Sequence, residues 1–240
     1  KAGAVLTSEG EQFTSYALSL LKIWEEARQQ IAIPEGYSRS FSFGAQHALW
    51  HKLGFRWIDA MQAMMPELSI HAEMGMSDRL TRFLVEGVIQ AALLYTPQLR
   101  PGLRVEPVLE EELILVASFE TDVKDLGKEY VAVDWGPEFT HMTNSGRSLA
   151  LGGLAADYIV NRRAAAYLPA RAVQRYLDVG KLHVVANSPR FAYPAWVVWR
   201  EDLDPEMLSI ARRSLMDLAQ AAENQQNILI ESLDNGQNTP

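Results

Sequence analysis

Two histidines four positions apart have the most recognisable chemical spacing in this sequence. His47 and His51 fall on one face of a helix predicted for residues 47–65, since an α-helix brings residues i and i+4 together. Such a pair is typical of zinc sites, but zinc needs a third ligand, and no spacing motif supplies one. We therefore expect no metal site. Two interpretations of His47 stay open: a residue that lines a ligand cleft, or an ordinary surface histidine.

Motifs of the common enzyme classes are missing. The sequence contains no Gly-x-Ser-x-Gly, no P-loop and no Gly-x-Gly-x-x-Gly. The serine within residues 144–147 lacks the strand-turn-helix context of a nucleophile elbow. Residues 110–112 are three consecutive glutamates, which we expect to form a solvated face beside a strand. The sequence therefore predicts a protein that is not an enzyme and has no cofactor.

Polar side chains follow three predicted strands at the point where each strand ends. They are Gln46, His47, Ser77, Tyr95 and Thr96. In an open α/β sheet, ligands bind beyond the carboxyl ends of parallel strands and close to helix N-termini. We expect these residues to line a cleft for a small molecule. Two structural alternatives remain open, because Ser77 could help to cap a helix and Tyr95 could belong to the core.

Aromatic residues stand at the corresponding place in the second half of the chain. Trp135, Gly136 and Phe139 follow a strand predicted for residues 130–134. An aromatic pair at a cleft edge suits a flat or apolar ligand, although ordinary packing is the alternative. Tyr193 lies where the chain returns to its first half, and we expect it in the same cleft.

Two β/α units organise most of the chain. Strands and helices alternate over residues 39–94, which predicts a parallel sheet, and the pattern restarts near residue 130. A last amphipathic helix is predicted for residues 204–222, followed by a polar, fraying tail. Two crossing segments would then join the lobes and form a hinge beside a cleft. The expected division is a helix in residues 1–35, subdomain I in 36–117 and 193–240, and subdomain II in 118–192.

The first helix has a heptad pattern. Its seam alternates steps of four and three residues through Phe13, Ala17, Leu20, Trp24, Ala27 and Ile31. Ser8 and Glu11 fit the spacing of a capping box, so the helix would begin there and reach ~36 Å at ~1.5 Å per residue. The pattern favours a dimerisation helix. The alternative is a long helix that lies on its own core.

Composition narrows the class of protein further. The 240 residues have a formal net charge of −8 and contain no cysteine. An acidic chain with dispersed Lys and Arg is not expected to hold DNA by itself. The absence of cysteine excludes disulfides and thiolate metal sites. No apolar run approaches the ~18 residues of a membrane span, and the first residues do not form a signal peptide, so we expect a cytoplasmic protein without a membrane partner.

Several short motifs follow one another over residues 5–222. They are Leu6-Thr7-x-x-Gly10-Glu11 with Tyr16-Ala17, Pro66-Glu67-Leu68, Leu84-Val85-Glu86-Gly87, Glu112 to Val116, Ala164 to Pro169, and Gly180-Lys181-Leu182. In this order they resemble the linker helix and effector domain of LysR-type transcription regulators. Two positions depart from that family. Gln90 stands where an acidic residue is usual, and Asn161-Arg162-Arg163 stands where Gly-x-Gly is common; these arginines either pair with an acidic effector or complement a helix dipole.

The resemblance implies a fold and a mode of action. The fold is α/β, two-lobed and periplasmic-binding-protein-like (type II), with two crossover strands after a long linker helix. A small-molecule effector would bind in the cleft of a homodimer or homotetramer and change the bend of bound DNA. The residues themselves suggest its chemistry: the polar strand ends suit a carboxylate, and the aromatic pair suits an aromatic compound. DNA would be contacted only through a winged-helix head preceding Leu6. The alternative function is a stand-alone solute-binding protein of the same fold, which would have no use for the heptad helix.

Overall fold

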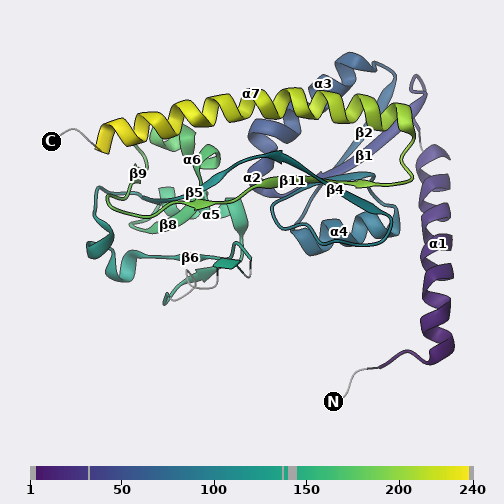
Figure 1. The fold of residues 1–240 in the computed structure, drawn as a ribbon, viewed down its shortest axis with the longest axis horizontal. Coiled ribbons are helices and arrows are strands. Elements are labelled where there is room, and N and C mark those ends of the chain that lie inside the picture. Colours follow the sequence, from purple (N-terminus) through teal and green to yellow (C-terminus); the bar gives the residue numbers. More distant parts are fainter. Residues whose placement is uncertain (1–3, 32, 137, 140–144, 238–240) are drawn as a thin grey trace.

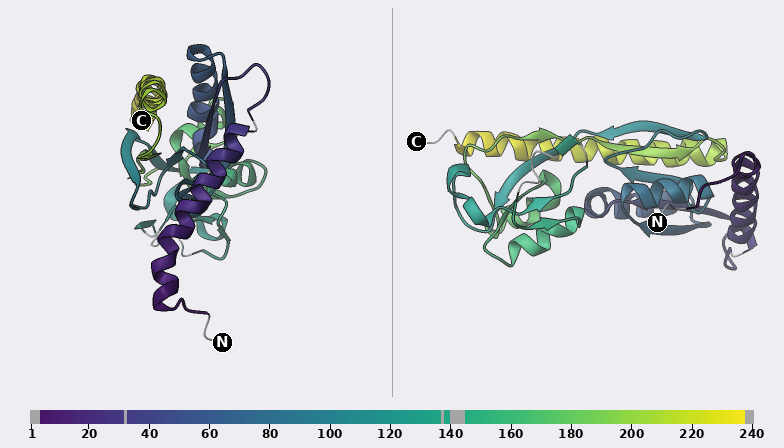
Figure 2. Two further views of the ribbon diagram at one scale, coloured as in Figure 1. Left: turned by 90° about the vertical axis from the view of Figure 1, so that its right-hand side faces the viewer. Right: turned by 90° about the horizontal axis from the view of Figure 1, so that it is seen from below.

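The computed structural model describes residues 4–31, 33–136, 138–139 and 145–237. Two lobes lie side by side, and helix α7 (Pro205–Gln237) runs along both of them (Figure 1). Helix α1 (Ser8–Ile31) stands at the outer end of the first lobe, and its N-terminal part projects beyond the body (Figure 2). Within the described residues, no helix has the length and apolarity needed to cross a bilayer.

The first lobe contains a five-stranded mixed sheet in the order β2-β1-β3-β11-β4. Its strands are β1 (Arg39–Ala45), β2 (Leu68–Met74), β3 (Ala91–Leu94), β4 (Leu103–Leu109) and β11 (Ala195–Arg200). Strands β1, β2 and β3 are parallel, as the alternating pattern predicts. Ala45 lies opposite both Met74 and Leu93, so the three strands end at one edge of the sheet. Strand β4, which the sequence did not suggest, closes the sheet antiparallel to β11.

The second lobe contains a smaller sheet in the order β10-β5-β8, with β9 also paired to β5. Its strands are β5 (Glu112–Ala117), β8 (Ala165–Pro169), β9 (His183–Val184) and β10 (Phe191–Ala192), and a separate parallel pair joins β6 (Ala132–Val133) to β7 (Ser148–Leu149). Two short segments connect the lobes, one between β4 and β5 and the other between β10 and β11. The chain therefore crosses twice, as a hinge requires.

Short helices connect the strands within each lobe. In the first lobe they are α2 (His47–Leu49), the π-helical η1 (Trp50–Gly54), α3 (Phe55–Met64) and α4 (Ser77–Glu86); in the second they are η2 (Val123–Asp125), η3 (Gly127–Glu129), η5 (Gly152–Leu154), α5 (Ala155–Val160) and α6 (Ala170–Leu177). The first three form one continuous helical run, in the place where a single helix was predicted. Gly87, with φ of 81°, ends α4 in the left-handed conformation.

Helix α1 begins at Ser8, as predicted, but Ser8 is not its capping residue. Thr7 caps it, because its Oγ1 accepts a hydrogen bond from Gly10 N at 3.1 Å and its carbonyl accepts one from Glu11 N at 2.9 Å. One face of the helix packs on α4 and β1, and Lys22 forms an ion pair with Asp202. The remaining apolar residues are exposed.

Helix α7 extends well beyond the predicted end at residue 222, so the expected fraying tail is wrong. Its first half packs on α3 and β4, and further along it contacts η1 and α6. Its Glu223 accepts a hydrogen bond from the backbone N of Glu110, on the first crossing, at 2.9 Å. The helix continues because no Pro or Gly interrupts residues 206–235. As a result, α7 lies over both lobes.

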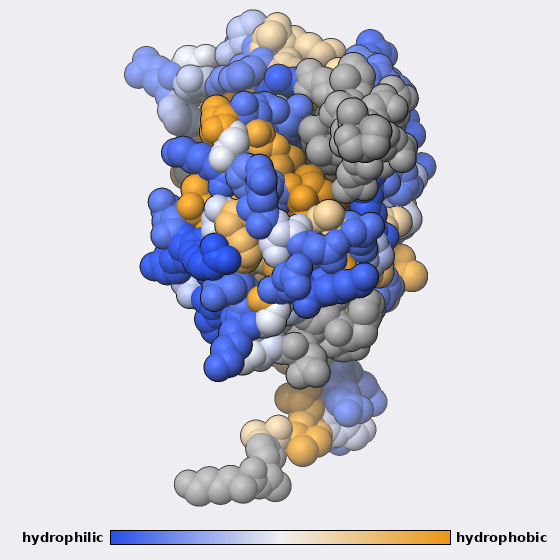
Figure 3. Space-filling view, turned by 90° about the vertical axis from the view of Figure 1, so that its left-hand side faces the viewer, coloured by the Kyte–Doolittle hydropathy of each residue, from blue (hydrophilic) through white to orange (hydrophobic). Residues whose placement is uncertain are grey.

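Aromatic residues fill the core of the first lobe. Phe41 and Phe43 pack edge-on against Trp57, with ring centroids 5.5 and 4.6 Å apart. The Trp57 Nε1 donates to the carbonyl of Ala211 at 3.1 Å, which attaches α3 to α7. The outer end of the second lobe is mainly hydrophilic, with apolar residues showing between the charged ones (Figure 3).

Candidate functional site

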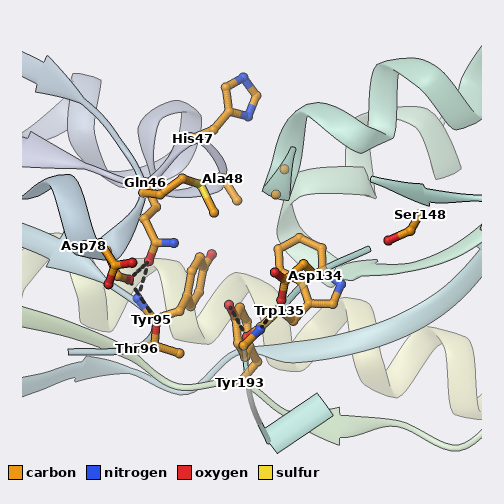
Figure 4. A pocket seen from close by; sticks show the side chains of 15 residues that line it. Gln46, His47, Ala48, Asp78, Tyr95, Thr96, Asp134, Trp135, Ser148 and Tyr193 are labelled. Carbon is orange, nitrogen blue, oxygen red and sulfur yellow. Dashed lines mark hydrogen bonds between the residues drawn. The ribbon is translucent and has the colours of Figure 1, made fainter. Parts of the chain in front are cut away.

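A cleft of about 510 Å³ lies between the two lobes. Its lining residues are Gln46, His47, Ala48, Met76, Ser77, Asp78, Tyr95, Thr96, Asp134, Trp135, Gly136, Ser148, Gly152, Gly153 and Tyr193 (Figure 4). The first lobe contributes the residues after β1, β2 and β3, because these strands end at the same edge. The second lobe contributes the residues after β6 and around η5. Eight of the nine sequence-predicted ligand residues are thus brought together, and Phe139 lines an adjoining hollow of about 490 Å³.

Three polar side chains of the first lobe form a connected group in this cleft. The Oε1 atom of Gln46 accepts hydrogen bonds from Tyr95 N at 2.7 Å and from Ser77 Oγ at 3.3 Å. Ser77 Oγ lies 2.8 Å from Thr96 Oγ1. These bonds fix the orientation of the Gln46 amide. Among the described residues, no protein atom accepts a hydrogen bond from Gln46 Nε2, which points into the cleft (Figure 4).

His47 is among the residues that line the cleft, but its ring points away from the other labelled side chains (Figure 4). Burial lowers its pKa, the charge of Asp157 raises it, and His51 and Arg175 lower it further; the net shift is downward. This shift favours the neutral form of the ring. In the described part of the chain, no group of three or more His, Asp or Glu side chains is placed to hold a metal.

An aromatic wall closes the cleft beside the crossings. The rings of Tyr95 and Tyr193 stack with centroids 4.2 Å apart, and Trp135 meets Tyr193 edge-on at 5.4 Å. Phe139 packs against the same Tyr193 at 5.5 Å, so it supports the wall from the adjoining hollow. Trp135 Nε1 donates to the carbonyl of Tyr167 at 2.9 Å. The wall thus joins β3, the second crossing and the second lobe.

Two glycines mark where the lobes touch. Gly136 has φ of 109°, and a Cβ added to it would lie 3.2 Å from Thr96 Cγ2. A Cβ on Gly153 would lie 2.8 to 3.0 Å from Ala48, including its backbone. The cleft is therefore narrow at both contacts. Sequence reasoning missed Ala48, Gly153 and their neighbours because no motif relates residues of separate lobes.

A buried ion pair lies beside the aromatic wall. Glu111 and Arg171 are 2% and 6% exposed, and Arg171 Nε and Nη2 donate to the two carboxylate oxygens at 3.0 and 2.8 Å. Tyr95 Oη donates to the same carboxylate at 2.8 Å. Burial and then the charge of Glu111 raise the pKa of Tyr95 well above its ordinary value. The expectation that residues 110–112 form a solvated face is wrong for Glu111, which the first crossing turns inward.

The two arginines at the position where the sequence departs from the LysR pattern lie outside the cleft. Arg162 and Arg163 stand at the C-terminal end of α5, where they cover the rings of Tyr158 and Phe119 at 4.2 and 3.8 Å. Arg162 also reaches the carbonyl of Tyr158. Neither arginine lines the cleft.

Comparisons with known proteins identify the architecture. The sequence profile of the LysR substrate binding domain matches residues 34–132. This match assigns residues 34–132 to a LysR-type regulatory domain. The HTH-type transcriptional regulators HdfR of Salmonella schwarzengrund and Salmonella newport are each 24% identical in an alignment of 214 residues that covers 83% of this chain and 74% of theirs. The family is non-enzymatic, as expected from the missing motifs.

Solved structures share the fold. Full-length OxyR from Pseudomonas aeruginosa, carrying one substitution, has a TM-score of 0.64 at 16% identity and covers 90% of this chain and 78% of its own. The regulatory domain of MexT from the same species has a TM-score of 0.61 at 15% identity, covering 76% and 99%. LysG of Corynebacterium glutamicum, with its bound effector Arg, has a TM-score of 0.61 at 13% identity, covering 92% and 81%. These LysR proteins confirm the periplasmic-binding-protein-like fold with an N-terminal helix.

Proposed function

We propose that this regulatory domain binds a small-molecule effector in the cleft and responds by changing the angle between its lobes. The observation that carries the proposal is the lining of the cleft by both lobes: Gln46, Ser77 and Thr96 on one side and Trp135 on the other. A ligand that touches both sides binds the closed form more tightly, and only such differential affinity shifts a conformational equilibrium. LysG, which shares this fold, has a bound effector Arg, and this supports a small-molecule ligand for the present chain.

The sequence predicts lobes of residues 36–117 with 193–240, and 118–192, and we propose the same two lobes with the first boundary moved to the crossing before β5. Strand β5 (Glu112–Ala117) pairs with β8, so the second lobe's sheet includes a strand that precedes residue 118. The hinge of the proposed movement lies in the two crossings, next to Glu111 and Tyr193. Stacking of Tyr193 on Tyr95 would be altered by any rotation there.

Helix α1 is proposed to assemble the protein into homodimers or larger homo-oligomers. Phe13, Leu20, Trp24 and Ile31 of the heptad seam are exposed by 59%, 61%, 66% and 85%. Ala17 is half-buried and Ala27 exposed. A row of large apolar side chains in water is typical of an interaction surface. This surface also favours a regulator over a stand-alone solute-binding protein, which would have no use for it.

DNA is proposed to be read by a helix-turn-helix segment of the kind named in the HdfR relatives, not by the residues described here. The net charge of −8 opposes direct binding to a polyanion. Effector binding would act on DNA through the spacing of the subunits in the assembly.

A thermal-shift screen against small amines, carboxylates, aromatic compounds and nucleobases tests the proposal. A ligand at about a hundred times its Kd adds about 2.7 kcal/mol of stability, which corresponds to roughly 5–11 °C in Tm for a chain of this size. Ser148 is exposed, lines the cleft and points into it, so Ser148→Trp should fill the site and abolish the shift. Ser209→Trp, at an exposed position on α7, is the matched control. A ligand-induced rise in Tm that persists in Ser148→Trp would contradict binding in the cleft.

A further inference from the structure

Carboxylates, and no lysine or arginine, line the cleft and the hollow beside it. Asp78 and Asp134 line the cleft, and Asp78 and Glu138 line the hollow. All three are exposed. No Lys or Arg belongs to either lining, and the residues at 137 and 140–144, outside the description, are Pro, Thr, His, Met, Thr and Asn. An anionic ligand would find no lysine or arginine among these lining residues to pair with.

The N-terminus of α4, at the cleft, does not offset the negative charge of these carboxylates. Asp78 stands in the first turn of α4, so a negative side chain already complements the positive end of the helix dipole. The nearby carboxylates also affect the aromatic wall. Burial raises the pKa of Tyr193, and Asp134, Glu111 and Glu138 raise it further. A carboxylate placed here would add a like charge to this region.

Two uncharged features of the cleft indicate which other groups the ligand contains. Gln46 is 8% exposed and has its Nε2 donor directed into the cleft without a protein acceptor. An amide donor that faces a cleft bonds to water there, and an acceptor atom on a ligand can replace that water. Tyr95 and Trp135 line the cavity with aromatic surface, which attracts both flat rings and cations.

We infer that the effector is a cationic amine or guanidinium compound with an aromatic or apolar body and an acceptor atom. The cation faces Asp134 in the second lobe, and the acceptor meets Gln46 Nε2 in the first. This inference rests on the proposed function and names its ligand class. It replaces the carboxylate that the polar residues at the strand ends suggested. A molecule held between Gln46 and Asp134 bridges the lobes, so its binding favours closure.

Three matched probes test the inference. Tryptamine, 3-ethylindole and indole-3-propionate share one aromatic body and a two-carbon arm, and differ in a terminal charge that is positive, absent or negative. Binding to the whole chain is measured by ¹H–¹⁵N NMR titration at low salt. Tryptamine should bind about tenfold or more tightly than indole-3-propionate, with 3-ethylindole between them. Added salt should reduce the preference, because exposed carboxylates are screened.

Substitutions then assign the charge preference to the cleft. Asp134→Asn should weaken tryptamine about three- to tenfold and leave 3-ethylindole unchanged. Asp125→Asn, an exposed carboxylate of the same lobe that does not line the cleft, should change neither. Ser148→Trp should abolish all binding of the three probes.

The outcomes separate the two proposals. Tighter binding of indole-3-propionate, equal binding of all three probes, or no binding of any probe overturns the inference of a cationic effector. If indole-3-propionate binds and Ser148→Trp abolishes its binding, the proposed cleft function stands without the inference. Binding that persists unchanged in Ser148→Trp contradicts both.

Discussion

Replacing Arg171 by methionine tests whether the buried ion pair holds the lobes together. Methionine keeps the length and helix propensity of the side chain but removes its charge. Glu111 would then be 2% exposed with only the hydroxyl of Tyr95 and a backbone amide as partners. Removing one partner of a buried pair costs about 3–5 kcal/mol, because the other charge stays uncompensated. For a chain of this size the Tm would fall by roughly 6–20 °C.

Equilibrium unfolding in urea, followed by tryptophan fluorescence, measures this loss. Arg175→Met is the matched control, since Arg175 lies one turn further along α6 and is 49% exposed; its loss should be below about 1 kcal/mol. The double variant Glu111→Gln with Arg171→Met removes the uncompensated charge and should recover a large part of the stability. The reasoning is refuted if Arg171→Met is no more destabilising than Arg175→Met, or if the double variant recovers nothing.

Three further variants test other parts of the structure. Trp24→Lys should weaken self-association in sedimentation experiments and change unfolding by less than about 0.5 kcal/mol, since an exposed side chain is replaced; unchanged association would count against the α1 interface. The pKa of His47 is lowered in the folded protein, so as the pH falls through about 6.5 the unfolded chain takes up a proton before the folded one, and the free energy of unfolding decreases. Between about pH 7.5 and pH 5, His47→Gln should therefore lose less stability than the wild type or the exposed control His71→Gln. Gly153→Ala should push the lobes apart and weaken effector binding, whereas Gly146→Ala, with open space around it, should not; equal affinities would show that the contact at η5 does not set the cleft width.

Local patterns were sufficient to predict the parallel strands of the first lobe and one side of the site. The alternating strands and helices of residues 39–94 predict parallel strands that end at one edge, and the register of β1 with β2 and β3 confirms this. Gln46, Ser77 and Thr96 therefore meet because each follows a strand end. The role of these residues in ligand binding stays a prediction.

Contacts between distant segments could not be predicted in this way. Glu111 and Arg171 are sixty positions apart, so no local pattern relates them. A run of three glutamates is usually solvated, and only the path of the chain through the first crossing shows which of the three is buried. The second lobe is built from short strands such as β6 and β7, whose two residues each are too few for a periodic pattern. Asp134 lines the cleft from the end of β6, but a lone aspartate beside a tryptophan has no distinguishing signal in the sequence.

The placement of these contacts suggests how the cleft could communicate with the assembly helix. Helix α1 packs on α4 and β1 and pairs through Lys22 with Asp202, so it is attached to the first lobe, whereas Arg171 belongs to the second. Tyr95 lines the cleft with its ring and binds Glu111 with its hydroxyl. A ligand that moves Tyr95 would therefore disturb the one buried carboxylate that holds α6 against the hinge. Rotation of the second lobe relative to α1 would follow, and in an oligomer joined through α1 that rotation changes how neighbouring subunits meet.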